Sequence, residues 1–233
     1  MMKLGQMFSK ERTYDMNGRS NVWDGSMAGA HVQTNGFAAG TQVATNLGWR
    51  NVEALQQGDM VLTFDDGLQR VQRVERTVIG DAQLGLPMQH WPLRVPKGAL
   101  GNHSEMTLLP EQPVMVESDL GEAMFGDPFT LVPACALEGY KGIERLNPRD
   151  AVEVISIHFE TEQVVFANVG ALFHCTPAQG DLVDDLTCES YGPGYEVLSM
   201  TQAARFVAAM ISEADQDAAW MSVAGKATAS CVA

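Results

Sequence analysis

The residue types that carry most protein chemistry are present but scattered. The cysteines and histidines form no C-x-x-C, H-E-x-x-H or H-x-H pattern; they are Cys135, Cys175, Cys188, Cys231, His31, His90, His103, His158 and His174. Closely spaced ligands of these kinds mark zinc and redox sites, and the G-x-S-x-G, G-x-G-x-x-G and P-loop motifs are absent too. We therefore predict no cofactor and no metal, although a metal site assembled from distant histidines stays open.

Two stretches carry a more specific pattern. Gly36–Leu62 has the form G-F-x-x-G-T-x-V-x-T-x-x-G followed by V-E-x-L-x-x-G-D-x-V-L, and Leu109–Val116 reads L-P-E-Q-P-V-M-V. The first resembles the C-F-x-x-G-T opening of the Hint domain, the self-processing module shared by inteins and hedgehog proteins. The second resembles the T-P-x-H-P-V-x-V motif of the same family.

The resemblance implies a chemistry for which this chain lacks the side chains. In the family, the first residue is Cys, Ser or Thr and attacks the preceding carbonyl, while the Thr and His of the second motif bind the scissile peptide and protonate its nitrogen. The matching positions here are Gly36, Leu109 and Gln112. The resemblance thus predicts a degenerate domain without catalytic residues. Substituting Cys, Thr and His at these positions is expected to restore thiol-triggered cleavage after Asn35 if the geometry is preserved.

Further segments extend the resemblance over residues 36–178. Leu131–Ala134, Ile157–Phe159, Gln163–Ala167 and Phe173–His174 are similar, in order, to segments of a bacterial Hint subfamily common in marine alphaproteobacteria. A late histidine assists asparagine cyclisation in inteins, but no asparagine is adjacent to His174. We predict a packing or surface role for this histidine.

Short strands separated by turn residues must position these motifs. Such spacing favours an all-β fold over βαβ units, and the resemblance specifies a Hint-like fold of many short antiparallel strands. The expected strands are 41–45, 60–64, 91–95, 106–109, 114–117, 129–132, 151–159 and 163–167, together with a return strand after Gly67 that runs through Val71, Val74, Val78 and Ile79. We expect hairpin turns at Asp65–Gly67 and at Glu160–Glu162.

Segments of different character flank this β domain. Residues 1–35 are polar and lack periodicity, which predicts an extended N-terminal arm. Residues 179–233 begin as an acidic linker and then predict a short amphipathic helix and a frayed tail of about a dozen residues. Ser199 and Gln202 form its expected capping box, ahead of a stripe running from Ala203 to Ala214 that we expect to pack within the chain.

The composition of the chain argues against nucleic acid and membrane as partners. The net charge of −14 argues against nucleic acid, since phosphate contacts need basic patches. No apolar run approaches the roughly 20 residues of a membrane span. We therefore expect a location in the cytoplasm, or in a virion if the chain derives from a phage.

The function expected from these patterns is a non-catalytic structural or protein-interaction module. Its partners would be protein subunits of a larger assembly, such as a phage or phage-like particle, and oligomers of the chain itself are a further option. The alternative is an autoprocessing domain that cleaves near Asn35–Gly36 with a displaced nucleophile, Thr34 or Thr41, for which the sequence offers no recognisable base.

Overall fold

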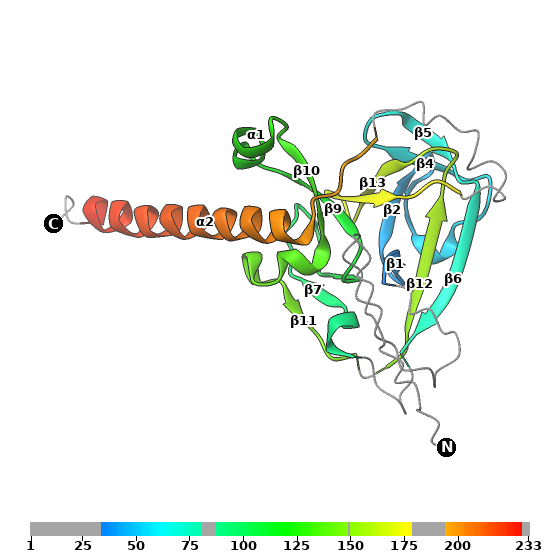
Figure 1. Cartoon of the computed structure of the whole chain (residues 1–233), viewed down its shortest axis with the longest axis horizontal. Coiled ribbons are helices and arrows are strands. Elements are labelled where there is room, and N and C mark those ends of the chain that lie inside the picture. The colour runs from blue at the N-terminus through cyan, green and yellow to red at the C-terminus, as the bar shows by residue number, and fades with distance from the viewer. Residues whose placement is uncertain (1–33, 81–86, 149, 179–193, 230–233) are drawn as a thin grey trace, which may run out of the picture. The chain divides into compact units, whose positions relative to one another are not determined.

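The computed structural model describes residues 34–80, 87–148, 150–178 and 194–229, with side chains up to residue 214 (Figure 1). Most of the predicted arm, the linker 179–193 and the last four residues of the chain lie outside this range. The domain boundaries predicted at residues 35 and 178 therefore stay predictions.

The described strands form two antiparallel sheets, which confirms the all-β prediction. The six-stranded sheet has the order β11 (Glu144–Arg145), β7 (Leu93–Val95), β8 (Met106–Leu108), β1 (Phe37–Ala38), β12 (Val152–His158) and β6 (Arg73–Ile79). The second sheet runs through β10 (Phe129–Pro133), β9 (Pro113–Glu117), β14 (Ala171–Cys175), β13 (Gln163–Ala167), β2 (Gln42–Thr45), β4 (Met60–Thr63) and β5 (Gly67–Arg70), with β3 (Gly48–Asn51) paired to β2.

The hairpin predicted at Glu160–Glu162 is wrong. Strand β12 pairs with β6 over its whole length and with β1 at Val154 and Ile155 on its other edge. Strand β13 instead pairs with β14, with Val165 opposite Phe173. The segment at 160–162 therefore crosses from one sheet to the other.

The single return strand predicted after Gly67, through Val71, Val74, Val78 and Ile79, is also wrong in part. The turn at Asp65–Gly67 does join β4 to β5, with Thr63 opposite Gly67. The chain then leaves that sheet at Val71, which is buried in the core, and β6 joins the other sheet. The backbone bonds locate the change of sheet, because Val71 still bonds to Gly58 and Asp59 beside β4, whereas the amide of Gln72 donates to His158 O of β12 at 2.8 Å.

The family-like motif at 52–59 is used to shape backbone. Glu53, in the 3-10 turn η1 (Val52–Ala54), accepts a hydrogen bond from the amide of Gly40 at 3.0 Å. Asp59 accepts from the amide of Gln56 at 3.0 Å and from Arg50 at 3.1 Å. Val52 and Leu55 of the motif, and Val61 just after it, are fully buried. The acidic residues thus fix turns around a strand pair that contributes to the core.

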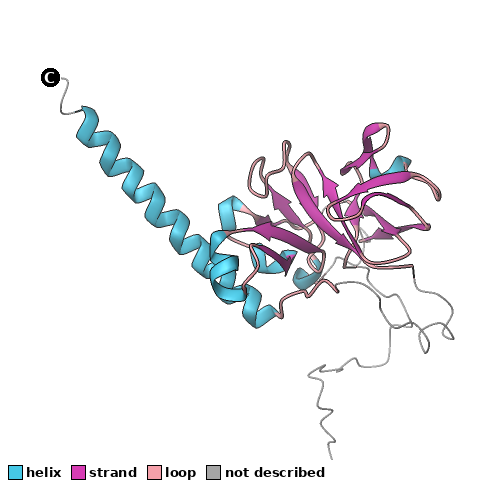
Figure 2. Cartoon of the chain, turned by 90° about the horizontal axis from the view of Figure 1, so that it is seen from above, coloured by secondary structure: helices cyan, strands magenta, loops and turns pink. Residues whose placement is uncertain are grey.

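Buried residues from both sheets form one large hydrophobic cluster. Figure 2 shows the strands of the two sheets packed together. Phe37 and Phe173, one from each sheet, place their ring centroids 5.3 Å apart. Short 3-10 turns complete the connections: η2 (Met88–His90), η3 (Ala134–Leu137) and η4 (Tyr140–Gly142). Strand β1 is therefore held from two directions, by its sheet neighbours and by the opposing sheet.

Two α-helices pack beside the sheets. Helix α1 (Asp119–Phe125), which the sequence did not predict, starts at Ser118, whose side chain accepts from the amide of Leu120, and ends at Gly126 with φ of 83°. Helix α2 (Met200–Ala229) starts at the expected capping box, because Gln202 Oε1 accepts from the amide of Ser199 at 3.1 Å. It extends beyond the predicted stripe and includes most of the stretch expected to fray.

The apolar stripe of α2 packs within the chain, as predicted. Ala203, Phe206, Val207 and Met210 are buried against α1, β10 and the turns η3 and η4. The rings of Phe206 and Phe125 meet edge to face at 5.7 Å. None of the described helices combines the length and the apolar character needed to cross a membrane.

Candidate functional site

Gly36 lies immediately before β1 and contacts the side chain of Gln112, the residue at the position of the family's histidine. Its backbone amide donates a hydrogen bond to Gln112 Oε1 at 2.9 Å, in a buried position. These two residues are 76 positions apart in the chain. The structure thus brings together two of the three positions where the family carries its catalytic side chains.

Gln112 is locked in place by its other side-chain atom. It is 1% exposed, and its Nε2 donates to the carbonyl oxygens of Pro113 at 2.9 Å and His174 at 2.8 Å. All hydrogens of its amide are therefore used on backbone carbonyls, which leaves Oε1 as the atom that faces Gly36. At the family's proton-donor position this chain presents a hydrogen-bond acceptor.

Leu109 fills the third position with an apolar side chain. It is fully buried and forms a small cluster with Ile79 and Val154. Val154 lies on β12 directly opposite Ala38 of β1. The side chain of Leu109 therefore stabilises the packing near the Asn35–Gly36 peptide bond and offers no hydrogen bond to it.

The backbone at Gly36 leaves no space for a larger residue. Its φ is +117°, a conformation that side chains with a Cβ rarely adopt. A Cβ added there would lie 2.9 Å from Ser156 Oγ, 2.9 Å from Val154 Cγ1 and 3.2 Å from Ile155 O. A cysteine at position 36 therefore does not fit this geometry unless the side chains of Ser156 and Val154 move.

The two candidate displaced nucleophiles have different surroundings. The hydroxyl of Thr34 donates a hydrogen bond to the carboxylate of Glu111, whose amide in turn donates to Thr34 O at 2.8 Å. Thr41 is buried at 3% exposure, and its backbone shapes the turn through bonds to Ala38 and Val52. Sequence reasoning found no base for either residue, because Glu111 is distant in sequence from Thr34.

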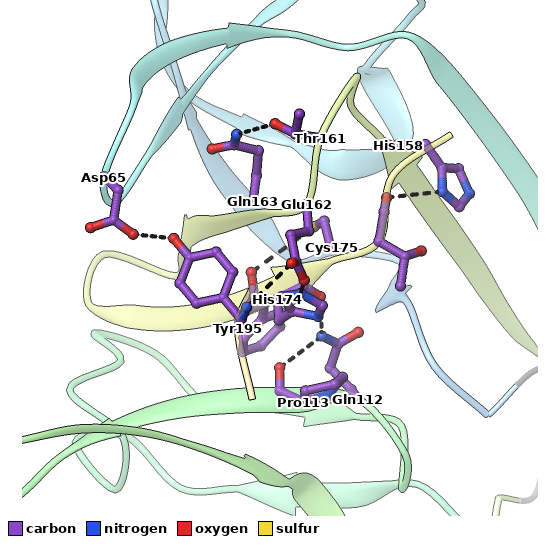
Figure 3. Close-up of polar contacts among 12 residues, drawn as sticks. Asp65, Gln112, Pro113, His158, Thr161, Glu162, Gln163, His174, Cys175 and Tyr195 are labelled. Atoms are coloured by element: carbon purple, nitrogen blue, oxygen red, sulfur yellow. Dashed lines mark hydrogen bonds and ion pairs between the residues drawn. The ribbon is translucent and has the colours of Figure 1, made fainter. Parts of the chain in front are cut away.

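A second polar cluster borders Gln112 and was missed from the sequence (Figure 3). His174 is 8% exposed, and its Nε2 lies 3.0 Å from Glu162 Oε2. The other Glu162 oxygen accepts from the amide of Tyr195 at 3.2 Å, and the Tyr195 hydroxyl donates to Asp65. The cluster joins β14, the segment before β13, the β4–β5 turn and the segment before α2.

Tyr195 in this cluster and Cys175 beside it both have raised pKa values. Desolvation, the hydrogen bond to Asp65 and the negative charges of Asp65, Asp66 and Glu162 all raise the pKa of Tyr195. Cys175 follows His174 in the strand, so its side chain points to the other face, into the main core. Burial raises the pKa of the Cys175 thiol, which keeps it protonated and unreactive. The histidine therefore has a carboxylate partner but no adjacent nucleophile.

The scattered cysteines and histidines do not assemble a metal site in the part of the chain that the structure describes. No group of three His, Cys, Asp or Glu side chains lies close enough there to hold a metal ion. His31, Cys188 and Cys231 lie outside that part.

Comparison with solved structures finds inteins and intein-like domains. A bacterial intein-like domain from Clostridium thermocellum is 15% identical, with 61% of this chain and 99% of that chain covered and a TM-score of 0.45. The gp41-1 intein is 16% identical, with 59% and 96% covered and a TM-score of 0.36. The Msm DnaB1 intein splicing domain bound with zinc is 14% identical, with 58% and 98% covered and a TM-score of 0.34.

Sequence comparison identifies the family. No curated protein matches the chain. The family profile of the Hint domain matches residues 35–173, which is more than half of the chain and starts at the residue before Gly36. This chain belongs to the Hint domain family.

Proposed function

We propose that this protein is a Hint-domain protein that does not cleave itself and that acts as a structural or protein-interaction module. The observation that carries the proposal is the hydrogen bond from the Gly36 amide to Gln112 Oε1. For the Asn35–Gly36 bond to break, the nitrogen of Gly36 has to gain a proton as it leaves. That nitrogen instead donates its own hydrogen to an amide oxygen that cannot supply one.

The surroundings of Gly36 support the same conclusion. Glycine offers no attacking atom, and the close approach of Ser156 and Val154 leaves no room for a side chain that would. Leu109, at the position of the family's threonine, is a buried apolar residue that cannot bind the scissile peptide through its side chain. Each of the three positions contributes to the stability of the folded domain, which explains how the fold is retained without its reaction.

The interaction part of the proposal is supported by the outer surface of the β2–β5 strands. Leu62 and Leu68 are cross-strand partners that are both exposed. Trp49 is exposed on β3, which lies on the other side of β2, and Leu47 is exposed in the β2–β3 turn. Grouped apolar side chains on a surface are typical of protein contacts. The partner is proposed to be a protein subunit, and the phage-like particle stays a prediction from the sequence.

Intact mass spectrometry tests the proposal. The purified chain should remain one species of 25.2 kDa after prolonged incubation with and without a thiol. A pair of fragments separated between Asn35 and Gly36 would overturn it. Native mass spectrometry of the same sample reports the oligomeric state and any co-purifying subunit.

One observation favours a second candidate, autoprocessing at Thr34. Its hydroxyl donates to the Glu111 carboxylate, which is a group able to accept the proton of an attacking hydroxyl. Cleavage by this route would occur before Thr34 and not before Gly36, so the fragment masses separate the two. Thr34→Ala and Glu111→Gln should each abolish any such cleavage, whereas Thr41→Ala, at a buried turn, serves as the matched control.

A further inference from the structure

Asn35 and Gly36 form a chemically labile pair. Asn35 is exposed, and Gly36 has no Cβ to hinder attack on the asparagine side chain. In such a pair the amide nitrogen of the glycine loses its proton and attacks Cγ of the asparagine. The new C–N bond closes a succinimide ring and ammonia leaves; water then opens the ring to aspartate or isoaspartate, with the chain uncut.

The hydrogen bond to Gln112 blocks the first step. The Gly36 amide proton is held by Gln112 Oε1 at 2.9 Å in a buried position. Removing that proton would break the bond and leave a buried oxygen without a donor, which is costly. Gln112 cannot rotate to follow a moving nitrogen, because its Nε2 is held by the carbonyls of Pro113 and His174.

We propose that Asn35 is a deamidation site and that Gln112 protects it in the folded protein. Gln112 acts here as a positioning residue, since it holds the attacking nitrogen in its protonated, hydrogen-bonded form. The reaction requires only water and a base from solution. Local opening of the segment before β1 would expose the site and allow the modification.

Peptide mapping by mass spectrometry tests this in the wild-type chain. The protein is incubated in mildly alkaline buffer, folded or in concentrated urea, and isoaspartate at Asn35 is followed with time. The chain contains a second Asn–Gly pair, Asn17–Gly18, whose deamidation rate serves as an internal reference. Deamidation at Asn35 should be slower in the folded protein than in urea by about tenfold or more, the scale of one buried hydrogen bond. Equal rates would overturn the proposal.

Two further measurements identify Gln112 as the cause. Gln112→Leu, which keeps the volume and removes the acceptor, should raise the rate at Asn35 by about five- to a hundredfold while Asn17 is unchanged. A folded variant with the wild-type rate would refute the role of Gln112. If the variant does not fold, amide hydrogen exchange of Gly36 in the wild-type protein is measured instead. Exchange as fast as in the unfolded chain would refute the role of Gln112.

The result is separable from the proposed function. Deamidation changes the mass of one peptide and leaves the backbone intact, whereas self-processing produces two fragments. A chain that deamidates rapidly but stays whole would refute this inference and leave the proposed function in place.

Discussion

Replacing Gly36 by alanine is expected to destabilise the domain strongly, although a single methyl group is added. The change acts through two independent features of the structure. The backbone has φ of +117°, and the added Cβ would lie 2.9 Å from both Ser156 Oγ and Val154 Cγ1. Neither neighbour is the loose end of a long side chain, because Ser156 and Val154 of β12 both have short side chains.

The magnitude follows from these two terms. A residue with a Cβ in a sparsely populated backbone region costs about 1–3 kcal/mol. Forcing an extra methyl into a packed region costs a further ~1–3 kcal/mol. The free energy of unfolding should therefore fall by about 2–6 kcal/mol, a large part of the roughly 5–15 kcal/mol typical of a folded domain.

Urea denaturation followed by circular dichroism measures this loss. Gly58→Ala is the matched control, because Gly58 also has a positive φ, +94°, but no atom lies within 4 Å of an added Cβ. The control reports backbone strain alone, so the difference between the two variants isolates the close approach to β12. A Gly36→Ala loss no greater than the Gly58→Ala loss would refute the steric argument.

A double-mutant cycle locates the contact. Val154→Ala removes the methyl group that faces the new Cβ, so the loss in the double variant should be smaller than the sum of the single losses by about 1 kcal/mol or more. Strict additivity would mean that Val154 does not limit the site. The result also applies to the variant designed to restore cleavage. A cysteine at position 36 should need a smaller residue at position 154, in addition to Thr at position 109 and His at position 112.

The remaining predictions concern stability and reactivity. Val169 has φ of 64° in the turn between β13 and β14, so Val169→Gly should raise the free energy of unfolding by about 0.5–1 kcal/mol, measured by urea denaturation; a loss would contradict the strain. The raised pKa of Tyr195 means that the folded state favours the protonated phenol, so this contribution is complete below the ordinary pKa of about 10 and is lost as pH rises above it. Stability should fall in that alkaline range, and less steeply in Tyr195→Phe; equal slopes would refute the assignment. Cys175 should resist alkylation until the protein unfolds, whereas the half-buried Cys135 should react earlier, as peptide mapping after timed labelling will show; early labelling of Cys175 would contradict its burial.

Local chemistry explains what the sequence determined. The positions of most strands, the Asp65–Gly67 turn and the start of α2 follow from alternation, turn residues and a capping box, which act over a few residues. The family was also visible, because Gly36, Leu109 and Gln112 lie within motifs whose other residues shape turns and core. The three positions that match the family's catalytic residues could thus be named before any contact was known.

Only the tertiary structure decided which of these pieces meet. Strand β12 pairs with β6 and β1, which lie far from it in sequence, whereas β13 forms a local hairpin with β14. The cluster of His174, Glu162 and Tyr195 has no local signature, since it is assembled from separate connections. The sequence showed that Gln112 cannot act as an acid, but the folded chain turned its oxygen toward the Gly36 amide, because its nitrogen is held by two carbonyls.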